Sequence, residues 1–206
     1  MTTTSPSHTE LEQLWAGEFG DAYLRRNIDA AAGRAAHWHD LLDRHPITGV
    51  LEVGCTQGDN LVHFTDHMPN EAMAGLDINP TVLEALEVNL PGIRAVQGVA
   101  RDLPFADREF DLVFTVGLLI HIPDDTLREV MAELVRCSRR FVYAGEYHSD
   151  EPTTIRYRDR DGMLFKRDYG SLFQQWFPEL RLVDGGYLTE DEGFDRVTWV
   201  MLERTD

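Results

Sequence analysis

The stretch VLEVGCTQGDN, residues 50–60, decides the fold class of this chain of 206 residues. It reads as a short apolar β-strand followed by a glycine turn that leads into a helix. A second apolar segment, residues 72–77, ends in the carboxylate of Asp77, at the spacing of about twenty residues that nucleotide-binding folds use for a ribose. The pair therefore predicts a ligand with a ribose and a small zwitterionic tail.

The spacing of the glycines argues against a dinucleotide. Dinucleotide-binding turns follow G-x-G-x-x-G, in which the middle glycine lets the backbone approach a pyrophosphate. Thr56 stands at that middle position here, and the next glycine is Gly58. A lone glycine turn can serve only to turn the chain, and an acid at a strand end can cap a helix. The prediction therefore depends on the glycine turn and the strand-end acid occurring together, within an alternating series of strands and helices.

Strand and helix patterns alternate around this stretch. We expect β-strands over 49–53, 72–77, 94–98, 111–116 and 141–144. Helices are expected over 60–67, 81–89 and 124–137, and Pro80 and Pro123 supply helix start signals. Strands separated by helices imply right-handed crossovers and a parallel sheet with helices on both faces.

The two ends of the chain differ from this alternation. Helical periodicity runs with interruptions from Glu10 to Leu42. After a helix expected over 169–176, strand-like runs at 180–187 and 196–202 leave no room for a helix between them, so they predict an antiparallel hairpin. The sequence predicts an α/β, doubly wound, seven-stranded and mostly parallel sheet with a C-terminal antiparallel hairpin and an N-terminal helical lid. This is the Rossmann-like layout of class I methyltransferases.

Size and composition indicate one soluble domain. We expect residues 1–9 to be disordered and 10–206 to form a single domain, with 10–45 as the lid. The net charge of −17 argues against a nucleic-acid binder, which needs a basic stripe. Two cysteines cannot build a disulfide framework, and no apolar run is long enough to cross a bilayer. We expect a cytoplasmic monomer or homodimer with no nucleic acid, no membrane and no metal site.

Longer blocks of sequence resemble one family. They are WAGEFGDAYLRRN at 15–27, FTVGLLIHI at 114–122, AGEY at 144–147 and LFKRDY at 164–169. With these blocks the chain resembles class I S-adenosylmethionine-dependent methyltransferases, and more closely the methylases associated with pseudaminic acid biosynthesis. The resemblance implies S-adenosylmethionine as cofactor and S-adenosylhomocysteine as product. It implies a small polar acceptor (a sugar acid, an amino sugar or an amino-acid-derived natural-product intermediate), methylated on O or N.

The resemblance also implies the cofactor site. Asp77 would accept hydrogen bonds from both ribose hydroxyls, and the backbone near Gly54 would approach the methionine part closely. Of Arg25 and Arg26, Arg26 is the better candidate to pair with the cofactor carboxylate, and the alternative is an arginine on a solvated helix face. Where many relatives carry an Asp that reads adenine, this chain has Val99, so either the Ala100 backbone reads the base alone or Asp102 substitutes. The cofactor set comprises Arg26, Glu52, Gly54, Cys55, Asn60, Asp77, Ile78, Val99, Ala100, Val116 and Gly117.

His121 is the leading candidate for a general base, because it follows the fourth strand at the carboxyl edge of the sheet. It could instead cap the next helix or only line the pocket. A hydroxyl or ammonium acceptor needs such a base, whereas a carboxylate acceptor does not. Tyr23 and Tyr147 are the other candidate catalytic residues. Residues that could bind an anionic acceptor are Arg25, His148, Arg156, Lys166 and Arg167.

Three rival functions share part of this pattern. A non-enzymatic regulator that only binds the cofactor would lack a closed acceptor pocket, and the expected lid and the histidines at the edge of the sheet argue against it. A tRNA or rRNA methyltransferase would use the same cofactor half, but the acidic charge opposes it. A nicotinamide-dependent oxidoreductase is disfavoured by Thr56 and by the terminal hairpin.

Overall fold

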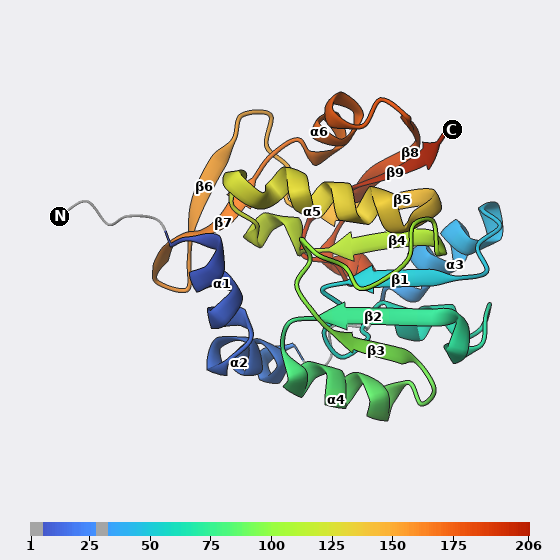
Figure 1. The fold of residues 1–206 in the computed structure, drawn as a ribbon, viewed down its shortest axis with the longest axis horizontal. Helices are drawn as coiled ribbons and strands as arrows, with labels where there is room; N and C mark the ends of the chain where they lie inside the picture. Colours follow the sequence, from blue (N-terminus) through green and yellow to red (C-terminus); the bar gives the residue numbers. More distant parts are fainter. Residues whose placement is uncertain (1–5, 28–32) are drawn as a thin grey trace.

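A seven-stranded sheet carries the fold in the computed structural model, which describes residues 6–27 and 33–206 (Figure 1). The strand order is β3-β2-β1-β4-β5-β9-β8. The strands are β1 (Val50–Val53), β2 (Met73–Asp77), β3 (Arg94–Gln97), β4 (Phe110–Val116), β5 (Ser138–Glu146), β8 (Leu180–Leu188) and β9 (Val197–Arg204). Strands β1 to β5 pair in parallel, and β9 is antiparallel to β5 and β8. The predicted fold class, including the terminal hairpin, is confirmed.

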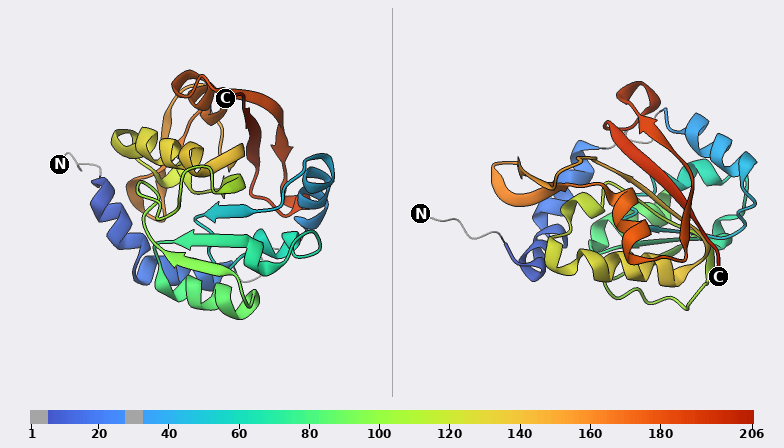
Figure 2. Two further views of the ribbon diagram at one scale, coloured as in Figure 1. Left: turned by 45° about the vertical axis from the view of Figure 1, so that its right-hand side comes forward. Right: turned by 90° about the horizontal axis from the view of Figure 1, so that it is seen from above.

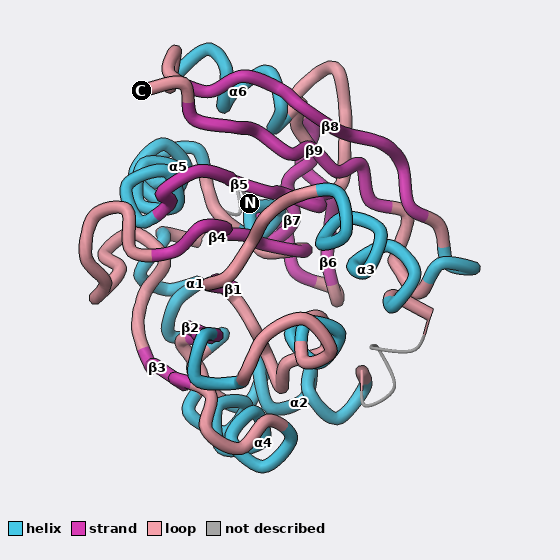
Figure 3. The backbone as a smooth tube through the Cα atoms, turned by 90° about the vertical axis from the view of Figure 1, so that its right-hand side faces the viewer, coloured by secondary structure: helices cyan, strands magenta, loops and turns pink. Residues whose placement is uncertain are grey.

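Helices cover both faces of this sheet (Figures 2 and 3). One face packs against α3 (Ala35–Arg44), α4 (Pro80–Asn89) and the 3₁₀ turn η1 (Leu61–Phe64). The other face packs against α5 (Asp124–Cys137) and α6 (Tyr169–Trp176). Successive residues of β4 enter the two cores in alternation, as expected for a strand that is buried on both sides. The bounds of α5 and α6 are those predicted.

The helix expected over 60–67 does not form. Only the four residues of η1 are helical there, because the chain turns at Thr56 (φ 47°) and again at Gly58 (φ 90°). The apolar residues that suggested a helix, Leu61 and Phe64, are buried all the same. Their burial comes from the turn and the core contact rather than from a continuous helix.

A hairpin outside the main sheet was not predicted. Strands β6 (Thr153–Tyr157) and β7 (Arg160–Lys166) pair with each other, joined by Arg158 and Asp159. Both joining residues have positive φ angles, 50° and 62°, as a two-residue hairpin turn requires. Glycine or asparagine is the usual signal for such a turn, and β6 is almost wholly exposed. Neither turn chemistry nor apolar alternation marked this hairpin in the sequence.

The first two helices, α1 (His8–Trp15) and α2 (Glu18–Arg26), lie with this hairpin on the side to which the arrows of β1, β2 and β4 point (Figure 1). Helix α1 starts inside the segment expected to be disordered, since Ser7 caps it in a reciprocal pair of hydrogen bonds with Glu10. Residues 1–5 lie outside the described part. Within residues 10–45, α3 packs in the core, so only α1 and α2 remain candidates for the predicted lid.

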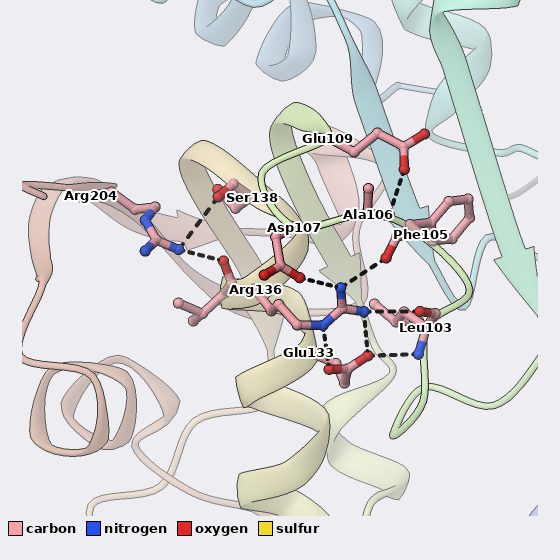
Figure 4. A network of polar contacts seen from close by, with 10 residues as sticks. Leu103, Phe105, Ala106, Asp107, Glu109, Glu133, Arg136, Ser138 and Arg204 are labelled. Carbon is pink, nitrogen blue, oxygen red and sulfur yellow. Dashed lines mark hydrogen bonds and ion pairs between the residues drawn. The ribbon is translucent and has the colours of Figure 1, made fainter.

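The loop between β3 and β4 is fastened to α5 by one arginine (Figure 4). Arg136 donates to the carbonyl groups of Leu103 and Phe105 at 2.9 and 2.8 Å, and it pairs with Asp107 and Glu133. Glu133 also accepts the Leu103 N–H at 2.7 Å. Hydrogen bonds from Arg136 lower the pKa of Glu133. In the described part of the chain, no helix is long and apolar enough to span a membrane.

Candidate functional site

Two adjoining cavities lie at the carboxyl edge of the sheet. The first, of about 140 Å³, lies between α1 and the ends of β1, β2 and β4. The second, of about 220 Å³, is bordered by α2, the β6–β7 hairpin and the segment before β9. Open α/β sheets bind ligands at this edge. The two cavities share Tyr23, Gly54, Thr56, Val116, Gly117 and His121.

The glycine turn after β1 forms the wall that the cavities share. Gly54 has φ 78°, and a Cβ there would lie 3.2 Å from the side chain of Leu118. The N–H groups of Gly54 and Cys55 both donate to the Leu76 carbonyl, at 2.8 and 3.1 Å. The Cys55 side chain is buried, which raises its pKa well above the usual value. Cys55 therefore packs the turn against β2 and is no thiolate.

Asp77 ends β2 and faces the first cavity. Its Oδ2 accepts the Thr56 N–H at 3.1 Å, and its Oδ1 accepts the Asn79 N–H at 3.0 Å. Burial raises the pKa of this carboxyl, against the opposing effect of these backbone hydrogen bonds. Each carboxylate oxygen has a second lone pair, so the fixed group can still accept hydrogen bonds from two hydroxyls.

The far wall of the first cavity is apolar. Ile78, Val99 and Ala100 line it, as the sequence suggested. Asp102, the alternative residue for binding adenine, is exposed and forms an isolated antiparallel β-bridge with Val99. Asp102 is absent from the described residues that line this cavity, whereas Ala100 is among them, so of the two adenine-binding alternatives only Ala100 lies at the cavity.

A buried polar network lines the second cavity. Glu52 is 1% exposed, and its Oε1 accepts the Asn60 amide at 2.6 Å. The Asn60 oxygen accepts hydrogen bonds from Arg34 at 2.8 Å and from the Trp38 indole at 3.3 Å. Within the described residues, the buried Glu52 Oε2 has no hydrogen-bond partner, and burial raises the pKa of Glu52 well above its usual value. Asp59 lines the same cavity.

Arg34 supplies the guanidinium of this network, where the sequence pointed to Arg26. Its Nε donates to the Gly193 carbonyl at 2.9 Å, which ties the segment before β9 to the start of α3. Arg25 and Arg26 are exposed on α2, and in the described structure neither lines a cavity. Arg34 stands alone between Arg26 and Arg44 in the sequence, with no motif around it, so only tertiary structure reveals it.

His121 faces both cavities at the end of the 3₁₀ turn η3 (Leu119–His121). Its Nδ1 lies 2.7 Å from the Met163 carbonyl, which can only accept. Nδ1 therefore carries the proton in the neutral ring, and Nε2 keeps a lone pair. The rings of Trp15 and Tyr157 lie 4.6 and 5.3 Å from its ring. Burial lowers the pKa of His121 to about 4, so the imidazole is neutral at neutral pH.

Two tyrosines of the site are neutral hydrogen-bonding groups. Tyr23 lines both cavities, and burial raises its pKa to about 12. Tyr147 lines the second cavity and donates to Asp195, and burial also raises its pKa. Phenols of this kind can orient a ligand but do not act as bases near neutral pH. Lys166 lies 5.3 Å from the centre of the Tyr147 ring.

The residues suggested for an anionic acceptor lie elsewhere in the described structure. Arg167 is buried and donates to Asp124 at 3.0 and 2.7 Å. His148 is exposed and pairs with Asp150, and Arg156 donates to a carbonyl of its own hairpin turn. Arg158, at the tip of that hairpin, is the basic residue that the hairpin contributes to the second cavity. The unpredicted hairpin explains the placement of Arg156, whereas Arg167 and His148 are held by Asp124 and Asp150.

Two histidines of α3, His37 and His39, have polar partners within the fold. His37 lies 3.0 Å from the Tyr143 hydroxyl, and His39 lies 3.7 Å from Asp66. In residues 6–27 and 33–206, no three His, Cys, Asp or Glu side chains are grouped so as to hold a metal ion.

Comparison with known proteins identifies a domain within the chain. Residues 50–140 match the family described as a methyltransferase domain. The uncharacterized methyltransferase sll0829 of Synechocystis is 33% identical over 87 residues, which cover 42% of this chain and 40% of that protein. A phthiotriol/phenolphthiotriol dimycocerosates methyltransferase of Mycobacterium tuberculosis is 35% identical over 92 residues, 44% of this chain and 33% of that protein. The chain spans less than half the length of these curated relatives.

Solved structures share the whole fold. A 1,6-didemethyltoxoflavin N1-methyltransferase of Burkholderia thailandensis, with bound S-adenosylhomocysteine, has a TM-score of 0.77 at 16% identity over 100% of this chain and 94% of its own. Magnesium protoporphyrin IX methyltransferase of Synechocystis, with bound S-adenosylmethionine, scores 0.70 at 12% identity over all of both chains. The [4+2]-cyclase SpnF scores 0.68 at 12% identity, covering 98% and 97%.

These comparisons show the class I methyltransferase fold. At such identities they do not transfer an acceptor, and SpnF is named for a cyclisation. The family match adds that residues 50–140 are similar to a methyltransferase domain, and the first two of these solved structures hold S-adenosylhomocysteine and S-adenosylmethionine.

Proposed function

We propose that this protein transfers the methyl group of S-adenosylmethionine to a small polar molecule bound in the second cavity. The observation that carries this proposal is the junction of the two cavities at Gly54, Gly117 and His121. One cavity offers a ribose acceptor and an apolar wall, and the other offers charged and polar groups. A nucleoside with a zwitterionic tail fits across this junction, and it leaves part of the second cavity for an acceptor.

The residues on the cofactor side fit S-adenosylmethionine. The base would lie against Ile78 and Val99, with its ribose on Asp77. The tail would pass Gly54 into the second cavity, where Arg34 would hold its carboxylate. The buried Oε2 of Glu52, which has no hydrogen-bond partner among the described residues, supports this placement, because an ammonium in the same cavity would supply the missing donor.

The chemistry asked of the protein is modest. When bound, S-adenosylmethionine supplies a methyl group on a sulfonium that is already activated for displacement. The protein contributes position, which is the largest effect available to it. The free Nε2 of His121 would accept a proton from an acceptor hydroxyl or ammonium. Tyr23 and Tyr147 would orient the acceptor by hydrogen bonds.

The lining of the second cavity supports a small polar acceptor. Arg158, Asn27 and the Tyr147–Asp195 pair suit carboxylates, hydroxyls and amines better than a long aliphatic chain. This favours the acceptor class of the pseudaminic-acid-associated methylases, namely sugar acids, amino sugars and amino-acid-derived acids. The net charge of −17 also argues for a small molecule over a nucleic acid.

An acceptor screen tests this proposal. We expect release of S-adenosylhomocysteine with at least one sugar acid, amino sugar or amino-acid-derived acid when the purified protein is given S-adenosylmethionine. Turnover of bulk tRNA or rRNA, with none of these small molecules methylated, would overturn the acceptor class and leave the cofactor assignment standing.

The proposed contact between Arg34 and the cofactor carboxylate can be tested by replacing Arg34 and Arg26 in two separate variants. Arg34→Met should weaken S-adenosylhomocysteine binding about 10- to 100-fold, because a buried hydrogen bond between charged groups is lost. Arg26→Met, which alters an exposed arginine of α2, should leave the affinity unchanged. Calorimetric titration measures both, and circular dichroism checks the fold. A larger loss of affinity in the Arg26 variant than in the Arg34 variant would instead assign the carboxylate contact to α2.

A further inference from the structure

Glu146 ends β5 and organises the turn that carries His121. Its side chain is 1% exposed, and in the described part of the chain it lines neither cavity. Its carboxylate accepts four hydrogen bonds from the loop after β4 and from β4 itself. Oε1 accepts from the Thr115 hydroxyl at 2.6 Å, the Leu118 N–H at 3.1 Å and the Leu119 N–H at 3.0 Å, and Oε2 accepts from the Ile120 N–H at 3.2 Å.

This turn determines where His121 lies. The His121 N–H donates to the Leu118 carbonyl at 2.9 Å, inside the turn that Glu146 holds. The ring of His121 is held separately, by the Met163 carbonyl on β7. The backbone position of His121 thus depends on β5, and the direction of its ring depends on the hairpin. Gly117, which precedes the turn, lines both cavities.

We propose that the Glu146 carboxylate is a positioning residue for His121, and that it holds the turn only while it is deprotonated. A protonated carboxyl carries an O–H donor, which the three backbone N–H groups cannot accept, so it cannot keep all four hydrogen bonds as they stand. Protonation would therefore release at least one of the amides of residues 118–120, loosen the turn and displace His121. The effect on turnover rests on the function proposed above, whereas the contact itself does not.

The surroundings of Glu146 set the pH range of this change. Burial raises its pKa to about 7, against the opposing effect of its four hydrogen bonds. His121 titrates far below that range, since its own pKa is lowered to about 4. Arg167 is engaged with Asp124 and with the Tyr169 hydroxyl. Around Glu146, the Thr115 hydroxyl of β4 donates to the carboxylate, and Thr198 is its pairing partner on β9. The phenols of Tyr143 and Tyr169 interact electrostatically with it, and Arg167 contacts the Tyr169 hydroxyl.

Backbone amide NMR during a pH titration tests the contact without any ligand. In the wild-type protein, the amide proton shifts of Leu118, Leu119 and Ile120 should follow one midpoint near pH 7, and so should the ring ¹⁵N shift of His121. Glu146→Gln should abolish this shared titration. Thr115→Val removes a donor that favours the ionised form, so it should move the midpoint upward by about one pH unit.

A matched control is available in Glu133. It also accepts a backbone N–H, from Leu103, but at the loop held by Arg136. Glu133→Gln should leave the shared midpoint of residues 118–120 unchanged.

Turnover provides the second measurement. The kcat of the wild-type protein should fall on the acid side with the same midpoint, and Thr115→Val should shift that midpoint while the alkaline plateau remains. Glu146→Gln should lower kcat about 10- to 100-fold, because His121 is misplaced. Its kcat should not titrate near neutral pH, and its KM for S-adenosylmethionine should stay within about twofold.

Three results would overturn the proposal. Amides of residues 118–120 that do not titrate between about pH 5 and 9 would show that the carboxyl does not change state there. A shared amide midpoint that the His121 ring does not follow would remove the positioning role. A kcat midpoint that Thr115→Val leaves in place would assign the acid limb to another group. If no acceptor is turned over at all, the proposed function fails, and the amide and ring titrations still decide the role of Glu146.

Discussion

Asp77→Ala is expected to abolish measurable binding of S-adenosylhomocysteine, with a loss of affinity of at least about 100-fold. Two effects add. The ribose loses a charged hydrogen-bond acceptor, and the Thr56 and Asn79 N–H groups lose the carboxylate that fixes the turn beside the ribose. Calorimetric titration with S-adenosylhomocysteine measures the change.

Asp111→Ala is the matched control for this variant. Asp111 also accepts a backbone N–H, from Thr48 at 2.9 Å, but it lies at the start of β4, the end opposite to the cavities. Its replacement should leave the affinity unchanged. Full binding by the Asp77 variant, or an equal loss in both variants, would contradict the ribose assignment.

His121→Ala is expected to lower kcat about 100-fold, the lower end of what a positioned base contributes, with cofactor affinity within about twofold. The reason is the free Nε2, held in the shared wall of the two cavities by the hydrogen bond of Nδ1 to Met163. Single-turnover rates with the acceptor found by screening measure the chemical step, and titration with S-adenosylhomocysteine measures the affinity.

The control for this variant is His148→Ala, since His148 is exposed and pairs with Asp150. Its kcat should match the wild type. An unchanged kcat in the His121 variant would mean that the histidine only lines the cavity, or that the acceptor is a carboxylate that needs no base. The pKa of His121, lowered to about 4, keeps its ring in the basic form at neutral pH. Titration of His121 therefore leaves the rate unchanged above about pH 5, and a change of rate near neutral pH would report the Glu146 carboxyl.

The sequence was most informative where the signal is local. The glycine turn, the acid at Asp77 and the start signals of α5 depend on neighbouring residues, and the structure places all three as expected. The β6–β7 hairpin carried no such signal. Its turn uses Arg158 and Asp159 at positive φ, and its first strand, β6, is almost wholly exposed. Without the hairpin, the lining of the second cavity could not be foreseen.

The sequence also did not reveal which residues the charged side chains would contact. Arg167 looked like an acceptor-binding residue, but Asp124, 43 positions earlier in the chain, engages its guanidinium. Arg34 carried no motif, yet the fold places it beside Asn60 in the second cavity. Glu146 ends β5 and is buried, which the position of an acid at a strand end does not reveal in the sequence. Spacing in the sequence locates such residues on an edge of the sheet, but their direction depends on contacts between distant segments.

The most direct test of the central claim is calorimetric titration of the wild-type protein with S-adenosylhomocysteine and, separately, with NADH. The missing middle glycine at Thr56, the ribose acid Asp77 and the polar tail site around Arg34 predict saturable binding of one S-adenosylhomocysteine per chain and no binding of NADH. Saturable binding of NADH, with none of S-adenosylhomocysteine, would contradict the account.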